Sequence, residues 1–187
     1  MSDKPEPSTL RREKVVEAAT DVFRRYGYGR TTMADIAQAA KISRPTLYAT
    51  FSDKAGIFES VIEGMVATEL VGIRRGLSHR HDLASRLRYA CRTWASAGFE
   101  LVQANPDAKD LFDDQFAAVR AGNAAFENLL VELLAEPVSK ADVEVTAPRL
   151  AEVIGYGMQG FKRFARTSAE LHRMIDTLVT TVCAALS

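Results

Sequence analysis

Residues 31–51 have the sequence TTMADIAQAAKISRPTLYATF, which predicts two short helices joined by a tight turn. Thr31 or Thr32 can cap the first helix, because a threonine side-chain oxygen accepts a hydrogen bond from an exposed backbone N–H. Ser43 can cap the second helix in the same way. We therefore expect a helix-turn-helix. Small or apolar residues recur at helical spacing on the inner side of both helices, namely Met33, Ile36, Ala37, Ala40, Leu47 and Phe51.

The start of the second helix gathers side chains that can recognise DNA. Arg44 can pair bidentately with guanine, Thr46 can donate, accept or touch a thymine methyl group, and Pro45 offers an apolar surface. Thr32 and Lys54, at the starts of the neighbouring helices, are placed to bind phosphates on either side of the groove. These positions predict a sequence-specific DNA binder. The candidate contact residues are Thr32, Lys41, Ser43, Arg44, Pro45, Thr46, Tyr48, Thr50 and Lys54.

The distribution of charge agrees with this prediction. The formal net charge of the whole chain is zero, but residues 1–54 contain ten basic and seven acidic side chains, a balance of +3. The remaining residues 55–187 contain 14 basic and 17 acidic side chains, a balance of −3. A basic part attached to an acidic remainder keeps phosphate binding local. Periodicity alone still allows the alternative that these residues are ordinary caps and surface positions of a helical hairpin.

The composition is that of a folded globular protein. The chain has 187 residues, of which 47% are hydrophobic and 26% charged, so it has ample material for a core. Cys91 and Cys183 lie far apart and lack the spacing of a zinc site, which favours free, buried thiols. No stretch resembles a signal peptide or reaches the ~18 apolar residues of a membrane span. We expect a cytoplasmic protein without a membrane partner.

The rest of the chain keeps a helical pattern, with proline and glycine at the junctions. A first helix is expected from Thr9 to Tyr26, because Gly27 suits the backbone position just past a helix end. Asn105-Pro106 and Glu136-Pro137 are expected to break helices, and no convincing strand appears. The fold class is therefore predicted to be all-α, with about nine helices. The later helices are expected at residues 54–77, 82–104, 107–118, 120–135, 147–166 and 168–186.

The segment from Val15 to Ile62 resembles the N-terminal domain of the TetR family of transcriptional regulators. The resemblance implies that Thr32, Tyr48 and Lys54 bind the DNA backbone, while Arg44, Pro45 and Thr46 face base edges. It further implies a homodimer on a near-palindromic operator, with half-sites about one helical turn or a multiple apart, and a ligand-binding C-terminal domain. The residues that carry it are Phe23, Gly27, Thr31-Thr32, Asp35-Ile36-Ala37, Ser43, Thr46-Leu47-Tyr48, Phe51 and Lys54.

Two positions depart from the pattern of that family. Lys41 occupies a turn position where members usually have glycine. This lysine either accepts a left-handed backbone at a cost near ~1 kcal/mol or reshapes the turn slightly. Ala49-Thr50 replaces the aromatic or histidine residues often found there, so those backbone contacts differ.

With the resemblance, the chain divides into a flexible arm at 1–8, a helix-turn-helix domain at 9–53 and a helical ligand-binding and dimerisation domain at 54–187. The run Gly155-Tyr156-Gly157-Met158-Gln159-Gly160 matches a GxGxxG motif, but no strand precedes it, so close helix packing is expected instead of a nucleotide site. Together with the apolar stripe of the last helix, it predicts a dimer interface of Gly157, Gly160, Phe164, Leu171, Ile175, Leu178 and Val182.

Aromatic side chains are dense in the C-terminal part, where most of them can be simple core. Family members enclose an apolar cavity among the middle helices, and few charges lie at inward positions here, which favours an apolar or aromatic ligand. The acidic residues Asp107, Asp110, Asp113 and Asp114 are expected to form a solvated helix face. No catalytic site, metal site or cofactor is predicted. The candidate ligand-binding residues are Trp94, Phe112, Phe116, Met158 and Phe161.

The leading hypothesis is a dimeric repressor that a small ligand releases from double-stranded operator DNA. An activator, or a regulator that responds to no ligand, is the alternative within DNA binding. An all-α ligand-binding protein or enzyme, in which the helical hairpin never meets DNA, is the alternative from another class.

Overall fold

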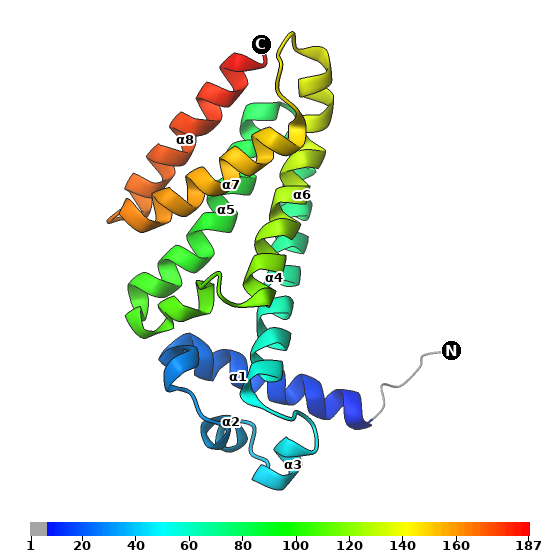
Figure 1. Cartoon of the computed structure of the whole chain (residues 1–187), viewed down its shortest axis with the longest axis vertical. Helices are drawn as coiled ribbons and strands as arrows, with labels where there is room; N and C mark the ends of the chain where they lie inside the picture. The colour runs from blue at the N-terminus through cyan, green and yellow to red at the C-terminus, as the bar shows by residue number, and fades with distance from the viewer. Residues whose placement is uncertain (1–6) are drawn as a thin grey trace. The chain divides into compact units, whose positions relative to one another are not determined.

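The computed structural model describes residues 7–187, and within that range it contains helices and no strand. Eight α-helices and one 3₁₀-helix follow one another in the described residues (Figure 1), which confirms the predicted all-α fold. Most of the predicted arm at 1–8 lies outside the described residues, and Pro7 and Ser8 already belong to the first helix. No helix in residues 7–187 is long and apolar enough to cross a membrane.

The helices are α1 (Pro7–Arg30), α2 (Met33–Ala39), α3 (Arg44–Tyr48), α4 (Lys54–Leu77), α5 (Leu83–Ala104), the 3₁₀-helix η1 (Pro106–Phe112), α6 (Ala117–Lys140), α7 (Ala147–Phe164) and α8 (Ser168–Ala185).

The chain divides into two compact units that do not follow the predicted boundary after residue 53. Of the described residues, the head unit contains 7–66 together with 101–119, and the body unit contains 67–100 and 120–187. The first part of α4 belongs to the head unit because Ile57, Phe58 and Val61 are buried in the same core as Phe23 and Leu47. The functional labels of the predicted domains remain predictions.

Two junctions differ from the sequence-based expectation. The helix expected at 107–118 is the 3₁₀-helix η1 followed by a short connection, and Pro106 occupies its first turn, where a missing N–H is tolerated. The expected break at Glu136-Pro137 is wrong, because α6 continues through Pro137 to Lys140. A proline so close to a helix end removes one donor, and its own carbonyl still accepts from Ala141 N at 3.1 Å.

Gly27 interrupts α1 with a bend. Its φ of 73° and ψ of 174° lie in a region that is open almost only to glycine. A Cβ atom at this position would collide with the backbone carbonyl oxygen of Asp107 and lie 2.7 Å from Oδ1 of Asp110. The regular helix therefore ends near Tyr26, as expected, but a further helical turn follows to Arg30.

In the body unit, α5 and α8 are joined by polar contacts at regular intervals. Arg88 donates to Thr180 at 3.1 Å, Arg92 Nε donates to Asp176 at 2.8 Å, and Ser96 lies 2.7 Å from the ring of His172. The α5 number rises by four at each step while the α8 number falls by four, so the two helices run antiparallel. The body core also contains Cys91, and burial raises the pKa of its thiol to about 12. Cys183 is half-buried, and both cysteines are free thiols.

We expect Gly27→Ala to lower the free energy of unfolding by about 3 kcal/mol, because it combines backbone strain with a collision. Chemical denaturation followed by circular dichroism measures the change. Gly72→Ala is the matched control: its Cβ would meet no atom within 4 Å, and alanine favours the helix by ~0.5–1 kcal/mol. Equal stabilities of the two variants would contradict the strain at Gly27.

Candidate nucleic-acid interface

The turn between α2 and α3 is a Schellman motif. Lys41 N–H donates to the carbonyl of Gln38 at 3.1 Å, and Ile42 N–H donates to the carbonyl of Ala37 at 3.0 Å. This pattern needs a left-handed backbone at the residue directly after the C-cap Ala40. That residue is Lys41, which has a φ of 55°. Of the two alternatives for Lys41, the structure therefore has the left-handed backbone. The Lys41 side chain is exposed.

Both helices of the motif begin with the predicted caps. Thr32 and Asp35 form a capping box, in which Thr32 N–H donates to Asp35 Oδ2 at 2.8 Å and Asp35 N–H donates to Thr32 Oγ1 at 3.3 Å. The Thr32 hydroxyl also donates to Asp35 Oδ2, at 2.7 Å, and this bond together with the one from Thr32 N–H lowers the pKa of the Asp35 carboxyl. Ser43 Oγ accepts from Thr46 N–H at 3.2 Å and lies 2.7 Å from Thr46 Oγ1. Both helix starts are thus fixed by local contacts.

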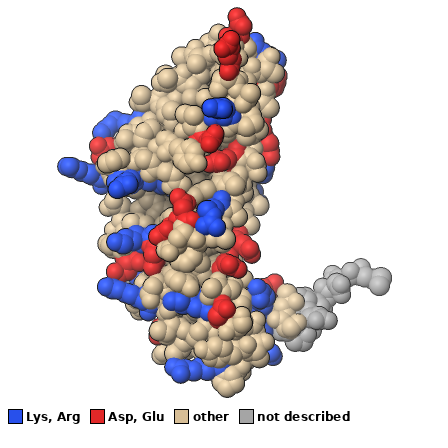
Figure 2. Space-filling view, in the orientation of Figure 1, with Lys and Arg blue, Asp and Glu red and all other residues tan. Residues whose placement is uncertain are grey.

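Helix α3 is anchored by one side and exposed on the other. Leu47 is fully buried, whereas Arg44, Pro45 and Tyr48 are exposed, Tyr48 to 54%. Thr46 is half-buried, and its carbonyl accepts from Thr50 Oγ1 at 3.0 Å. The hydroxyl groups of the predicted residues at 43, 46 and 50 therefore already have partners within the motif. Figure 2 shows that the charged side chains visible over α2 and α3, at the lower end of the view, are mostly basic.

Lys54 has a structural role that the sequence did not reveal. Its ammonium group donates to the carbonyls of Tyr28 and Thr31, at 2.7 and 2.9 Å, and lies 4.0 Å from the centre of the Tyr28 ring. An ammonium group has three hydrogens, so two of them serve these carbonyls. Lys54 ties the start of α4 to the end of α1, and its predicted phosphate contact stays a prediction.

Asp107 and Asp110 of η1 also bind the end of α1, so the expectation of a merely solvated acidic face is wrong for them. Asp110 accepts from the backbone N–H groups of Tyr28 and Gly29, each at 2.8 Å. Asp107 pairs with Arg30 at 2.6 Å. A carboxylate that accepts from N–H groups at a helical turn is stabilised by the local dipole as well. Nothing in the spacing of the acids could indicate these partners, which are about 80 residues away.

The predicted ligand-binding residues are divided between the cores of the two units. Phe116 packs in the head unit, with its ring centre 4.9 Å from that of Tyr28 and 4.6 Å from that of Phe58, and Phe112 packs against the same core. Trp94, Met158 and Phe161 pack in the core of the body unit, where Trp94 stacks on Phe126. Their role in ligand binding stays a prediction, because aromatic character alone cannot assign a side chain to one of two cores.

The predicted dimer interface is also changed by burial. Leu171, Ile175 and Val182 are covered by the chain's own body core, with exposures of 0%, 0% and 6%. A Cβ atom on Gly157 would contact Leu178 of the same chain at 3.2 Å, so this glycine serves the packing of α7 on α8. Their burial removes the three α8 residues from the predicted interface. Helix α7 instead exposes three large apolar residues, Val153, Tyr156 and Phe164, at 54%, 68% and 72%.

We expect Asp110→Asn to lower the free energy of unfolding by about 1–3 kcal/mol. Each carboxylate oxygen of Asp110 accepts from one N–H group, whereas an asparagine amide is neutral and has only one acceptor oxygen. Thermal unfolding of the full chain measures the loss. Asp21→Asn on α1 removes an exposed carboxylate and should change stability by less than ~0.5 kcal/mol. If both substitutions are neutral, the contact of η1 with Tyr28 and Gly29 has no energetic weight.

Lys41→Gly should raise the free energy of unfolding by up to ~1 kcal/mol, because glycine adopts the left-handed backbone without the steric cost that lysine bears. Denaturant titration gives the change. Lys41→Asn is the control, since asparagine tolerates this backbone and also lacks the charge. A destabilised Lys41→Gly variant would mean that the lysine side chain contributes more to the fold than its backbone strain removes.

Comparison with known proteins agrees with this geometry. Residues 15–61 match the family model for bacterial regulatory proteins of the tetR family. The chain is 24% identical to the transcriptional repressor ComR of Escherichia coli K12, over 94% of this chain and 89% of ComR. It is 32% identical to the transcriptional activator FasR of Mycolicibacterium smegmatis, over 53% of this chain and 48% of FasR.

Solved structures share the whole fold. A TetR-family regulator from Cytophaga hutchinsonii superposes with a TM-score of 0.74 at 14% identity, over 98% of both chains. FadR of Thermus thermophilus, a TetR-family repressor solved with lauroyl-CoA, superposes with a TM-score of 0.64 at 21% identity, over 92% of this chain and 93% of FadR. The relatives named are transcription regulators rather than enzymes. Residues 15–61 thus match the DNA-binding domain of TetR-family transcriptional regulators, in which α2 and α3 form the helix-turn-helix, and the whole chain is similar to regulators of this type.

Proposed function

We propose that this regulator is a ligand-responsive repressor that binds a near-palindromic operator as a homodimer and acts in the cytoplasm. The observation that carries the proposal is the exposed start of α3. Arg44 and Pro45 face solvent directly beside a capped helix terminus, while Leu47 of the same short helix is fully buried. A rigidly anchored helix with exposed donors at its start suits the major groove.

The roles we propose for the contact residues follow from their exposure and their partners. Arg44 reads a guanine, and Pro45 contacts a thymine methyl group. The hydroxyl group of Thr46 is held by Ser43, so it is oriented before DNA arrives. Exposed Tyr48 binds a phosphate. Thr32, Lys41 and Lys54 complete the proposed phosphate contacts.

The homodimer is supported by the exposed apolar side chains of α7. Val153, Tyr156 and Phe164 are each more than half exposed, and apolar residues gathered on a helix commonly mark a protein interface. A Cβ atom on Gly160 would meet no atom within 4 Å, so this part of α7 leaves room for a second copy. Leu178 is half-buried beside Gly157 and can extend the interface. A two-fold dimer requires an operator with inverted half-sites.

Ligand response and repression are supported by relatives. FadR of Thermus thermophilus was solved with lauroyl-CoA and is a repressor, and FadR of Bacillus subtilis was solved with stearoyl-CoA. ComR, which matches 94% of this chain, is a repressor too. FasR is an activator, which keeps activation as the second possibility. The ligand we propose is small and largely apolar, within the body unit that holds Trp94, Met158 and Phe161.

Selection of bound fragments from random double-stranded DNA at physiological salt tests the proposal. We expect two inverted half-sites about one helical turn, or a multiple, apart. Arg44→Ala should weaken binding to the selected site by ~1–3 kcal/mol and relax the preference at one base position.

Arg44→Lys is the matched control for this experiment, because it keeps the charge but loses the bidentate fork. It should retain non-specific affinity and lose the preference at the same base. A selection that yields no motif above non-specific binding would overturn the proposed operator recognition. A single, unrepeated half-site would contradict the homodimer.

A further inference from the structure

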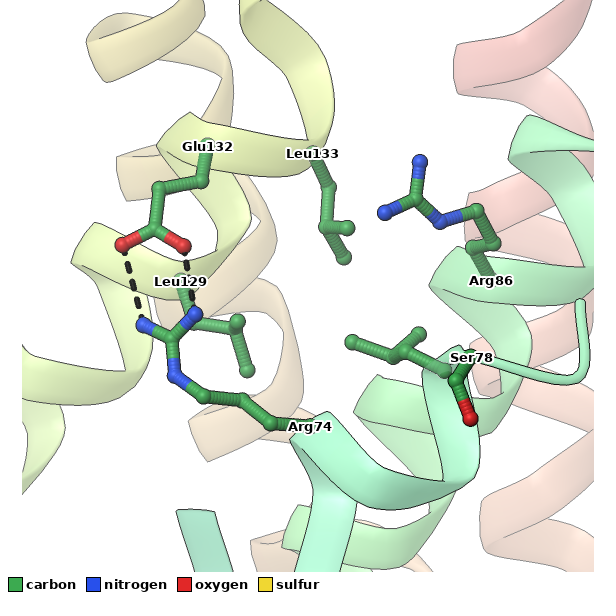
Figure 3. Close-up of a pocket in the computed structure, with 7 residues that line it drawn as sticks. Arg74, Ser78, Arg86, Leu129, Glu132 and Leu133 are labelled. Atoms are coloured by element: carbon green, nitrogen blue, oxygen red, sulfur yellow. Dashed lines mark hydrogen bonds and ion pairs between the residues drawn. The ribbon is translucent and has the colours of Figure 1, made fainter. Parts of the chain in front are cut away.

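A pocket of about 280 Å³ opens in the body unit, between the end of α4, the start of α5 and the middle of α6 (Figure 3). Three leucines from α4 and α6 line it, Leu77, Leu129 and Leu133, and each is at most 7% exposed. None of the candidate ligand-binding residues predicted from the sequence lines this pocket. Its volume is close to the ~300 Å³ at which small-molecule sites begin.

One side of the pocket is a neutralised ion pair. Arg74 donates to Glu132 through both of its terminal nitrogens, at 2.6 and 2.9 Å, and Figure 3 shows the two side chains facing each other as parallel forks. The hydrogen bonds from Arg74 lower the pKa of Glu132, so this carboxylate stays ionised. Glu132 is the acidic residue of the lining, and its charge is matched by Arg74.

Arg86 supplies a second positive charge that the pocket does not match. Figure 3 shows its guanidinium reaching from α5 towards Leu133, which lies between it and the Arg74–Glu132 pair in this view. Its Nε is buried and has no hydrogen-bond partner within the described residues. Glu136 on α6 interacts electrostatically with Arg86, but this carboxylate already accepts a hydrogen bond from Lys140 Nζ at 2.6 Å. A buried guanidinium N–H without an acceptor is unfavourable, and the one carboxylate that lines the pocket is already paired with Arg74, so it leaves the charge of Arg86 unneutralised.

We infer that this pocket binds a small amphipathic carboxylate, such as a free medium-chain fatty acid. The carboxylate would accept hydrogen bonds from the two terminal nitrogens of Arg86, in the bidentate geometry that guanidinium groups favour. The hydrocarbon chain would cover the three leucines and remove apolar surface from water. One negative charge on the ligand matches the one surplus positive charge. A thioester of the same acid lacks the carboxylate, so the site distinguishes the free acid from acyl-CoA.

Calorimetric titration of the full chain with octanoate tests the inference. Octanoate should bind, and Arg86→Gln should weaken its binding at least tenfold, because the glutamine side chain has neither the charge nor the fork. Octanol, which has the same chain but no charge, should bind more weakly than octanoate and equally to both proteins. Arg86→Lys should fall between the wild type and Arg86→Gln.

Arg75→Gln is the matched control, because Arg75 is exposed next to Arg74 in the last turn of α4 and does not line the pocket. It should bind octanoate within twofold of the wild type. Circular dichroism of each variant verifies the fold, and Arg86→Lys retains the test if Arg86→Gln does not fold. Absence of binding at millimolar octanoate, or equal affinity in Arg86→Gln, would overturn the inference.

The inference deepens the proposed ligand response by giving the ligand a chemical class, and it rests on that proposal only for its regulatory meaning. The titration contains no DNA, so a failure to bind octanoate leaves the operator selection unaffected. A failed operator selection, conversely, leaves carboxylate binding measurable.

Discussion

The bend at residues 27–31 is the constraint on which the arrangement of the head unit depends. Gly27 turns the backbone, and the polar groups that the turn exposes are satisfied from two sides: Asp110 accepts from two N–H groups, and Lys54 donates to two carbonyls. Unsatisfied backbone groups at such a place would destabilise the fold. The start of α4, the end of α1 and η1 are therefore joined at one short segment, directly before the helix-turn-helix begins.

Because η1 contributes to this junction, the head unit is completed by residues from the middle of the chain. Phe116 adds its ring to those of Phe23, Tyr28 and Phe58, and the same stretch of chain continues on both sides into helices of the body unit. An isolated N-terminal segment would lack both the Asp110 carboxylate and this ring. The exposed side of α3, with Arg44, Pro45 and Tyr48, is thus supported by residues that lie outside the family match at residues 15–61.

Much of the head unit could be predicted because its signals are local. The caps at Thr32 and Ser43 and the glycine bend all lie within a few residues of what they stabilise. The candidate ligand and dimer residues have no such local signal, since their assignment depends on which helices pack together. Leu171 and Ile175 have the spacing of an apolar stripe, but the same spacing serves a chain's own core and a partner's surface equally well.

Local sequence patterns were sufficient to establish an all-α protein with a helix-turn-helix, because helix periodicity and capping act over three or four residues. They also singled out Arg44, Pro45 and Tyr48 as the exposed face of that motif. Three-dimensional packing was needed for everything that joins distant segments. It brought Asp110 to Tyr28, turned Lys54 towards the end of α1 and left Arg86 unmatched beside three leucines. Hydrogen-bond partners some 80 residues apart leave no periodic signal, since only the folded chain brings them within reach.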